Sequence, residues 1–233
     1  MITYGDKLLP TQPFFSDGYK GKDYVQALAF VCDRYAVDLS PAYLDIDAPK
    51  SLELQKFSSS LETLSILRML ISLHGVKTVL EVGTLVGTTT IQLARMVGTG
   101  GKVVTVEIGE DYATYAQKNF AANETKAEVV LHCADAVSAM KSMVEPFDLI
   151  FLDGGKQDYP VLASEAERLL SERGLLVIDD VFFHGDALNL DPATDKGRGC
   201  KAVLEHYRRQ RDWCSCLLPV GNGLLILWRK GVA

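Results

Sequence analysis

The chain has 233 residues, of which 48% are hydrophobic and 23% are charged, and this balance excludes wholesale disorder and favours a folded protein with a sizeable core. Its formal net charge of −6 argues against a nucleic-acid partner, which usually meets a basic surface. The five cysteines form no CxxC pair, no apolar run approaches the ~18 residues of a membrane span, and the start lacks a signal-peptide pattern, so we expect a cytoplasmic protein without a membrane anchor.

The first 50 residues are predicted to form an N-terminal arm and a helix. Prolines and glycines among aromatic residues indicate an irregular arm up to about residue 21, and apolar residues at helical spacing predict a helix over residues 22–37. We expect this segment to pack on the body of the protein or on a dimer partner. Residues 51–233 are then expected to form a single globular domain.

Strands and helices alternate along most of this domain. A second helix is predicted from about residue 51 into a longer one over residues 61–74, which Gly75 ends. The alternation that follows predicts a parallel sheet with helices on both faces. Two apolar runs joined by Gly221-Asn222-Gly223 predict a hairpin, so the last strand should be antiparallel. The predicted strands are residues 77–82, 102–107, 127–132, 147–152 and 174–179, and the predicted helices are residues 88–97, 110–122, 135–144, 158–171 and 199–211.

The loop after the first of these strands is the main candidate for ligand binding. A buried strand, a glycine loop and a helix start follow one another from Val79 to about residue 95, which is how open α/β sheets bind nucleotide-like ligands. A dinucleotide fingerprint needs a glycine where Leu85 stands, so the loop disfavours a pyrophosphate and, with it, a dehydrogenase. The pattern E-x-G-x-x-x-G better suits a ligand without phosphate, and S-adenosylmethionine is such a ligand.

Residues around this loop are assigned to the methyl donor. Glu107 ends the second predicted strand, where a carboxylate can accept hydrogen bonds from both ribose hydroxyls, although it can also simply begin the next helix. Asp135 and Ala136 are placed beside the adenine, and Asp135 is equally suited to be a helix N-cap. Glu81 is expected close to the cationic donor. The full set predicted to bind the donor is Glu81, Gly83, Thr84, Gly87, Thr89, Glu107, Asp135, Ala136 and Asp153.

Three carboxylates predict a metal site at the same edge of the sheet. Asp153 follows the fourth predicted strand, and Asp179 and Asp180 end the fifth, so all three should lie close together. Such a cluster repels itself unless a cation compensates it. Oxygen ligands without a nearby histidine or thiolate suit Mg²⁺, with Mn²⁺ or Ca²⁺ as alternatives, rather than Zn²⁺. The other interpretation is that these residues only cap strand ends or carry surface charge.

Taken in order, these motifs resemble the metal-dependent class I S-adenosylmethionine O-methyltransferases of the caffeoyl-CoA and catechol type. The resemblance rests on the glycine loop, on the block F-D-L-I-F-L-D-G-G-K at residues 147–156 with Tyr159, and on P-V-G-N-G at residues 219–223, and it covers roughly residues 50–230. It implies an α/β fold with a Rossmann-like, doubly wound, seven-stranded sheet whose last strand is antiparallel, preceded by N-terminal helices. It also implies a homodimer.

The resemblance further implies methyl transfer to a hydroxyl of a small phenolic, catechol-like acceptor. Lys156 matches the general base of the resembling catechol enzymes, and Asp153 is assigned to catalysis together with it. Those enzymes have Asp, Asp and Asn as metal ligands, whereas this chain has Asp180 where the Asn is expected. A third carboxylate should tighten cation binding but weaken the acidifying effect of the cation on the substrate.

Two other functions stay open at this point. A metal-independent methyltransferase acting on a small-molecule oxygen or nitrogen would be insensitive to a chelator, and a non-catalytic S-adenosylmethionine-binding protein would bind the donor without turnover. On the acceptor side, Phe182, Phe183 and Tyr159 are candidates either for an aromatic wall or for the core. Residues 185–199 are interpreted as a mobile acceptor loop.

Overall fold

The described part of the chain folds around one mixed β-sheet. The computed structural model describes residues 37–39, 43–50, 52 and 58–231, so the predicted arm and nearly all of the helix predicted over residues 22–37 lie outside the described residues. The seven strands are ordered β3-β2-β1-β4-β5-β7-β6. Their bounds are β1 Thr78–Val82, β2 Lys102–Glu107, β3 Glu128–Cys133, β4 Phe147–Leu152, β5 Leu170–Ile178, β6 Trp213–Leu218 and β7 Leu224–Arg229.

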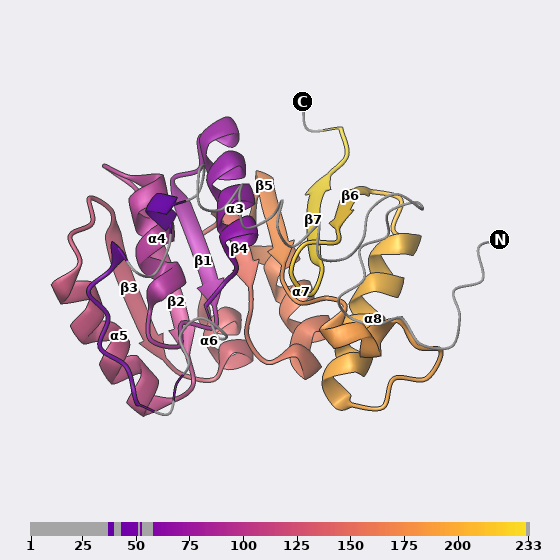
Figure 1. Cartoon of the computed structure of the whole chain (residues 1–233). Coiled ribbons are helices and arrows are strands. Elements are labelled where there is room, and N and C mark those ends of the chain that lie inside the picture. The colour runs from indigo at the N-terminus through magenta and orange to yellow at the C-terminus, as the bar shows by residue number, and fades with distance from the viewer. Residues whose placement is uncertain (1–36, 40–42, 51, 53–57, 232–233) are drawn as a thin grey trace, which may run out of the picture.

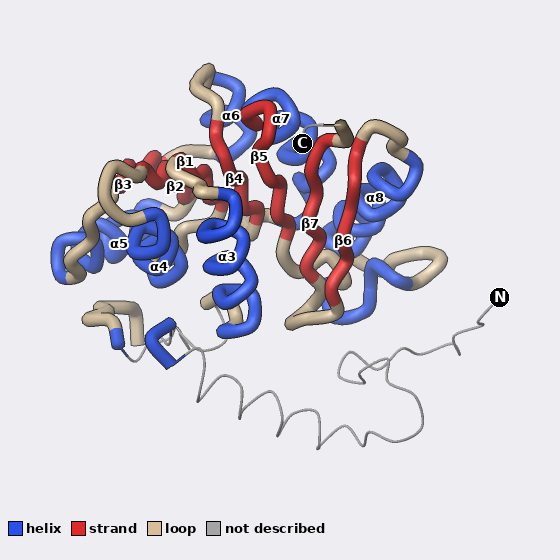
Figure 2. Tube along the Cα trace, turned by 90° about the horizontal axis from the view of Figure 1, so that it is seen from above, coloured by secondary structure: helices blue, strands red, loops and turns tan. Residues whose placement is uncertain are grey.

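Helices cover both faces of this sheet and enclose two apolar cores. Helices α3, α4 and α5 lie on one face, and α6, α7 and α8 lie on the other (Figure 2). Within the described residues, none of the helices is long and apolar enough to cross a bilayer. The helices are α3 Leu61–His74, α4 Thr88–Val97, α5 Glu110–Ala122, α6 Ala136–Ser142, α7 Tyr159–Leu169 and α8 Asp195–Arg209, with 3₁₀ turns η1 Val37–Leu39, η3 Lys156–Asp158 and η4 Phe183–Leu188.

The predicted architecture is confirmed, including the antiparallel end of the sheet. Strands β1 to β5 pair in parallel, whereas β7 runs antiparallel to both β5 and β6 (Figure 1). The turn between β6 and β7 contains Gly221 and Gly223, which have φ values of +53° and +92°. Glycine adopts these left-handed conformations without a steric cost, so the Gly-Asn-Gly sequence specifies the reversal.

The largest differences from the predicted boundaries lie before α3, β5 and α8. Helix α3 has the predicted bounds, but residues 58–60 before it are not helical, because Ser60 is extended and caps the helix by accepting the N–H of Thr63 at 3.1 Å. Most of the helix predicted from about residue 51 lies outside the described residues. Strand β5 begins at Leu170, directly after α7, rather than at residue 174. Helix α8 begins at Asp195 rather than at residue 199, because Thr194 accepts the N–H of Gly197 at 2.9 Å and so supplies the N-cap.

The parallel strands present their C-terminal ends at a single edge. The backbone hydrogen bonding continues for one residue past each of three strand ends, where the N–H groups of Gly83, Asp153 and Asp179 donate to carbonyls of the neighbouring strands at 3.0, 2.9 and 3.0 Å. These three residues are therefore held in register with the sheet although they lie outside its strands. The sheet thus places the glycine loop beside the carboxylates that follow β4 and β5.

Candidate active site

A cavity of about 780 Å³ opens at this edge of the sheet. Its volume falls within the range of natural ligand sites, roughly 300–1,000 Å³. The loops after β1 to β5 line it together with the β6–β7 turn and residues 58–60. The predicted site residues that this cavity brings together are Gly83, Glu107, Asp135, Ala136, Asp153, Lys156, Asp179 and Asp180.

Gly83 brings the loop after β1 into direct contact with the loop after β4. Its φ is +105°, and a Cβ at this position would lie 2.7 Å from the carbonyl oxygen of Asp153. Real Cβ atoms do not approach an oxygen so closely, and this backbone conformation is one that side chains disfavour. The two loops can therefore meet only because residue 83 is glycine.

Glu107 is held rigidly at the tip of β2. One carboxylate oxygen accepts the N–H of Leu85 at 2.7 Å, and the other accepts the N–H of Gly109 at 2.8 Å. Helix α5 begins only at Glu110, so Glu107 is the last residue of the strand and not part of the helix. Each carboxylate oxygen keeps a lone pair for a further donor. Glu107 lines the cavity and can accept further donors, and its contact with ribose hydroxyls stays a prediction.

Asp135 both caps a helix and lines the cavity. Its carboxylate accepts the N–H of Ser138 at 2.9 Å as the N-cap of α6. These hydrogen bonds from Ser138 lower the pKa of the Asp135 carboxyl. The two interpretations of Asp135 are thus compatible, and the contact of Asp135 and Ala136 with adenine stays a prediction.

Glu81 does not lie where the sequence led us to expect it. Its side chain is fully buried and does not line the cavity. One carboxyl oxygen accepts the hydroxyls of Thr90 at 2.5 Å and Thr105 at 2.6 Å, and the other has no hydrogen-bond partner in the described structure. Burial raises the pKa of Glu81 to about 8, so the group is largely protonated at neutral pH. Glu81 therefore joins β1 to α4 and β2 instead of facing a cationic ligand.

Glu81→Gln is expected to remove a pH dependence of stability. A folded-state pKa raised from 4.5 to about 8 means that the folded chain binds more protons than the unfolded chain between these values, so wild-type stability falls as pH rises through this window. The neutral amide has no such dependence. Urea unfolding at several pH values should show Glu81→Gln gaining stability relative to wild type as pH rises, whereas the exposed Glu124→Gln should follow wild type. Parallel pH profiles for wild type and Glu81→Gln would contradict the assignment.

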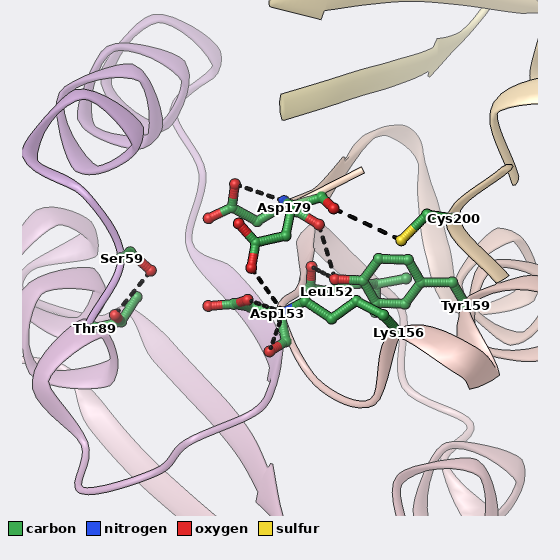
Figure 3. Close-up of polar contacts among 9 residues, drawn as sticks. Ser59, Thr89, Leu152, Asp153, Lys156, Tyr159, Asp179 and Cys200 are labelled. Carbon is green, nitrogen blue, oxygen red and sulfur yellow. Dashed lines mark hydrogen bonds and ion pairs between the residues drawn. The ribbon is translucent and has the colours of Figure 1, made fainter. Parts of the chain in front are cut away.

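Three more of the predicted donor residues also lie outside the lining. The Thr84 hydroxyl is 2.6 Å from that of Thr105, and a Cβ on Gly87 would run into the ring of Phe120. Thr89 donates its hydroxyl to Ser59 at 3.0 Å (Figure 3). These residues pack the loop and the start of α4 against neighbouring elements and do not face the cavity.

Ser58, Ser59, Ser60 and Thr63 line the cavity although none was predicted to do so. The signal for them was a run of three serines immediately before an apolar helix, which is typical of an N-cap region. The predicted helix runs through these serines, whereas residues 58–60 are not helical. The chain is extended at Ser60 and turns into α3 only afterwards, and the three serine hydroxyls bond to Thr88, Thr89 and Thr63.

Two of the three predicted metal ligands contact a lysine. The ammonium nitrogen of Lys156 lies 2.7 Å from a carboxylate oxygen of Asp153 and 3.2 Å from one of Asp180 (Figure 3). Asp180 also donates its N–H to the carboxylate of Asp179 at 2.9 Å. As these side chains lie, no group of three or more His, Cys, Asp or Glu among the described residues is arranged to hold a metal ion. Two carboxylates are turned onto Lys156, and metal coordination by the three aspartates stays a prediction.

The charges of this cluster are not balanced by its own residues. Burial, and then the neighbouring carboxylates, raise the pKa of Asp179 well above its ordinary value, and burial also raises the pKa of Asp153. Burial alone would lower the pKa of Lys156, but the carboxylates of Asp153 and Asp180 outweigh it and raise that pKa. Lys156 therefore keeps its proton in this arrangement, contrary to the lowered pKa expected of a general base. The cluster has three carboxylates and only one ammonium, so a further cation that prefers oxygen ligands would suit it.

The loop after β5 is strained and fixed by the β6–β7 turn. Asp180, Phe183 and His184 have φ values of +56°, +43° and +54°, a region that residues other than glycine rarely adopt. The Val181 and Phe182 N–H groups donate to carbonyls of the turn at 3.0 and 2.7 Å. Strained residues of this kind cluster at functional sites. Phe183 and His184 line the cavity, whereas Phe182 packs against the apolar core.

Tyr159 belongs to the core and not to an aromatic wall of the cavity. It is fully buried, and its hydroxyl donates to the carbonyl oxygens of Asp179 at 2.8 Å and Leu152 at 3.2 Å (Figure 3). The side chain thus ties together the ends of β4 and β5, from which the carboxylates project.

Tyr159→Phe is expected to lower the free energy of unfolding by about 1–2 kcal/mol, because it deletes buried hydrogen bonds without changing the ring. Chemical denaturation of wild type and variant measures the difference. Tyr43→Phe, at a position that is 62% exposed, should be indistinguishable from wild type. Equal stability of all three proteins would mean that the hydroxyl does not stabilise the strand ends.

Known proteins with a similar sequence are O-methyltransferases. A family model described as O-methyltransferase matches residues 46–230. Catechol O-methyltransferase of Niastella koreensis is 33% identical over 145 residues, which are 59% of this chain and 66% of that protein, so the aligned part spans just under two thirds of this relative. Probable caffeoyl-CoA O-methyltransferase 1 of Dictyostelium discoideum is 20% identical over 83% of this chain and 90% of its own.

Solved structures share the fold over nearly their whole length. A putative O-methyltransferase from Klebsiella pneumoniae superposes with a TM-score of 0.70 at 25% identity, covering 89% of this chain and 94% of that one. An O-methyltransferase from Bacillus cereus in complex with SAH gives a TM-score of 0.72 at 24% identity, covering 88% and 97%.

Proposed function

Since the chain belongs to the O-methyltransferase family, whose model matches residues 46–230, we propose that it transfers a methyl group from S-adenosylmethionine to a hydroxyl of a catechol-like phenol with the help of a divalent cation. The observation that carries this proposal is the set of residues that line one cavity. Gly83 and Glu107 lie on its lining together with the carboxylates that end β4 and β5. A methyl donor and an oxygen acceptor can thus be bound side by side.

The donor half of the cavity suits a nucleoside with a charged side chain. Glu107 presents a fixed carboxylate to hydroxyl groups, and Gly83 allows the loop after β1 to lie directly against the loop after β4. A ligand without a phosphate suits this part of the cavity, in agreement with Leu85 standing where the dinucleotide fingerprint needs a glycine.

The acceptor half supplies carboxylates and a lysine. Asp153, Asp179 and Asp180 are the residues that would hold a divalent cation, and such a cation would favour ionisation of a chelating phenol. The ammonium of Lys156 now has two carboxylate partners. If these partners turn to a cation, the charges that raise the pKa of Lys156 are compensated, and its nitrogen becomes a better proton acceptor. Close alignment of the two ligands then contributes much of the rate.

A methyltransferase assay with a cation titration tests the proposal. Vicinal-diol phenols and the matching monophenols are each incubated with S-adenosylmethionine, first with a chelator and then with increasing Mg²⁺ or Mn²⁺. Turnover that requires both the diol and the cation is the expected result. Equal turnover of monophenols with the chelator present would replace this proposal by metal-independent methylation. Donor binding by calorimetry without turnover of any phenol would favour a non-catalytic binding protein.

A further inference from the structure

One of the two lysines on the cavity lining has no acidic partner among the described residues. Lys156 is paired with Asp153 and Asp180, but Lys196 forms no hydrogen bond or ion pair with any residue that the structure describes. Its ammonium nitrogen instead lies 5.9 Å from the centre of the Phe183 ring. The carboxylates that line the same cavity are those of Glu107, Asp135, Asp153, Asp158, Asp179 and Asp180.

Lys196 belongs to the acceptor end of the cavity. It lies in the first turn of α8, which packs at the β6–β7 end of the sheet, whereas β2 and β3 with the donor residues lie toward the other end (Figure 1). Phe183, the ring below the ammonium, follows Asp180 by three residues. Lys196 and Phe183 thus lie against each other on the lining of the cavity that also contains the three aspartates.

The start of α8 is fixed by a network of hydrogen bonds and not by a mobile loop. The carboxylate of Asp186 accepts the N–H of Ala193 at 2.8 Å and both the N–H and the hydroxyl of Thr194 at 3.0 and 2.7 Å. Thr194 in turn caps α8. Lys201 donates to the carbonyl oxygen of Asn189 at 2.6 Å. The segment interpreted from sequence as mobile is thus tied to the helix that carries Lys196.

We propose that the acceptor is a catechol-like phenol that carries a carboxylate, and that Lys196 recognises this carboxylate at the cavity mouth while the hydroxyls reach the aspartates. The inference rests on the proposed function and deepens it. An anionic acceptor is repelled by the carboxylates deep in the cavity, so its negative group is most stable at the far end, beside the ammonium of Lys196. The ring of Phe183 gives the aromatic part of the same molecule an apolar surface.

The test compares three acceptors that differ only in charge, namely 3,4-dihydroxybenzoate, 3,4-dihydroxybenzamide and 3,4-dihydroxybenzylamine. Lys196→Met keeps the apolar stem and is expected to lower kcat/KM for the benzoate about tenfold, mainly through KM, because it deletes one charge-assisted contact. The benzamide should be nearly unaffected. High salt should weaken turnover of the benzoate by wild type more than that of the benzamide.

Lys118→Met is the matched control, because Lys118 also lies over an aromatic ring, 5.5 Å from the centre of Tyr115, but does not line the cavity. It should leave all three acceptors unchanged. A preference of wild type for the benzylamine, or an equal loss for all three acceptors in Lys196→Met, would overturn the role of Lys196 and leave the proposed function standing. Absence of turnover with every phenol in wild type would overturn the proposed function itself.

Discussion

Asp179→Asn is expected to lower cation-dependent kcat/KM by about 100-fold or more, since the stabilisation that a bound cation gives to a developing oxyanion amounts to several kcal/mol. Asp179 is the most deeply buried carboxylate of the cluster, at 6% exposure. Asparagine has the same shape and can still accept the N–H of Asp180, but it removes one negative charge from the set that would hold the cation. Turnover of a vicinal diol and cation affinity by calorimetry should fall together.

The stability of Asp179→Asn separates this effect from a folding defect. The pKa of Asp179 is raised by burial and by neighbouring carboxylates, so the ionised group destabilises the cation-free fold at neutral pH. The neutral variant should therefore be at least as stable as wild type while losing activity. Asp111→Asn, which removes a charge from the exposed start of α5, should change neither quantity. Full turnover by Asp179→Asn would show that this carboxylate does not hold the cation.

Asp180→Asn addresses the departure from the resembling enzymes. It introduces the asparagine that they carry and removes one of the two carboxylate partners of Lys156. An amide oxygen can still bind a hard cation, so we expect weaker cation affinity but a smaller loss of turnover than for Asp179→Asn. A loss as large as that of Asp179→Asn would mean that the negative charge of Asp180 is itself required.

The arrangement of the strands was predictable because parallel strands buried on both faces read as continuous apolar runs. Residues 149–152 are such a run, and all four are fully buried in β4. The convergence of Asp153 and Asp179 followed from the same pattern, because parallel topology brings strand ends to one edge. The backbone hydrogen bonds just past these strand ends give the physical reason.

What the sequence did not reveal depends on contacts between distant segments. Glu81 looked like a ligand-facing charge, but Thr90 and Thr105 from two other elements bind its carboxyl in the interior. The sequence predicts a later start for α8 because glycines 197 and 199 lower helix propensity. Gly199 is needed there, since any Cβ would overlap the backbone of Lys156 and Gln157. The charge state of Lys156 likewise depends on two carboxylates whose orientation no local pattern specifies.

Gly83→Ala is expected to destabilise the protein by about 2–4 kcal/mol, combining the strain of an unfavourable φ with the overpacking of a buried contact. The added Cβ would lie 2.7 Å from the carbonyl oxygen of Asp153 and 3.0 Å from the N–H nitrogen of Gly154. Both contacts are with backbone, which cannot swing aside as a flexible side chain would. The loops after β1 and β4 must separate, so donor affinity measured by calorimetry should fall by at least about tenfold.

Gly75→Ala measures the cost of the unfavourable φ alone, without the steric contact that is present at Gly83. Gly75 also has a positive φ, +64°, but a Cβ there would meet nothing within 4 Å, so we expect a cost of only about 1 kcal/mol and unchanged donor binding. The difference between the two variants measures the steric contact alone. If Gly75→Ala were as destabilising as Gly83→Ala, backbone conformation would explain both losses. The two loops cannot stay in contact once residue 83 has a side chain. Unchanged donor affinity in Gly83→Ala would therefore show that this contact does not shape the donor site.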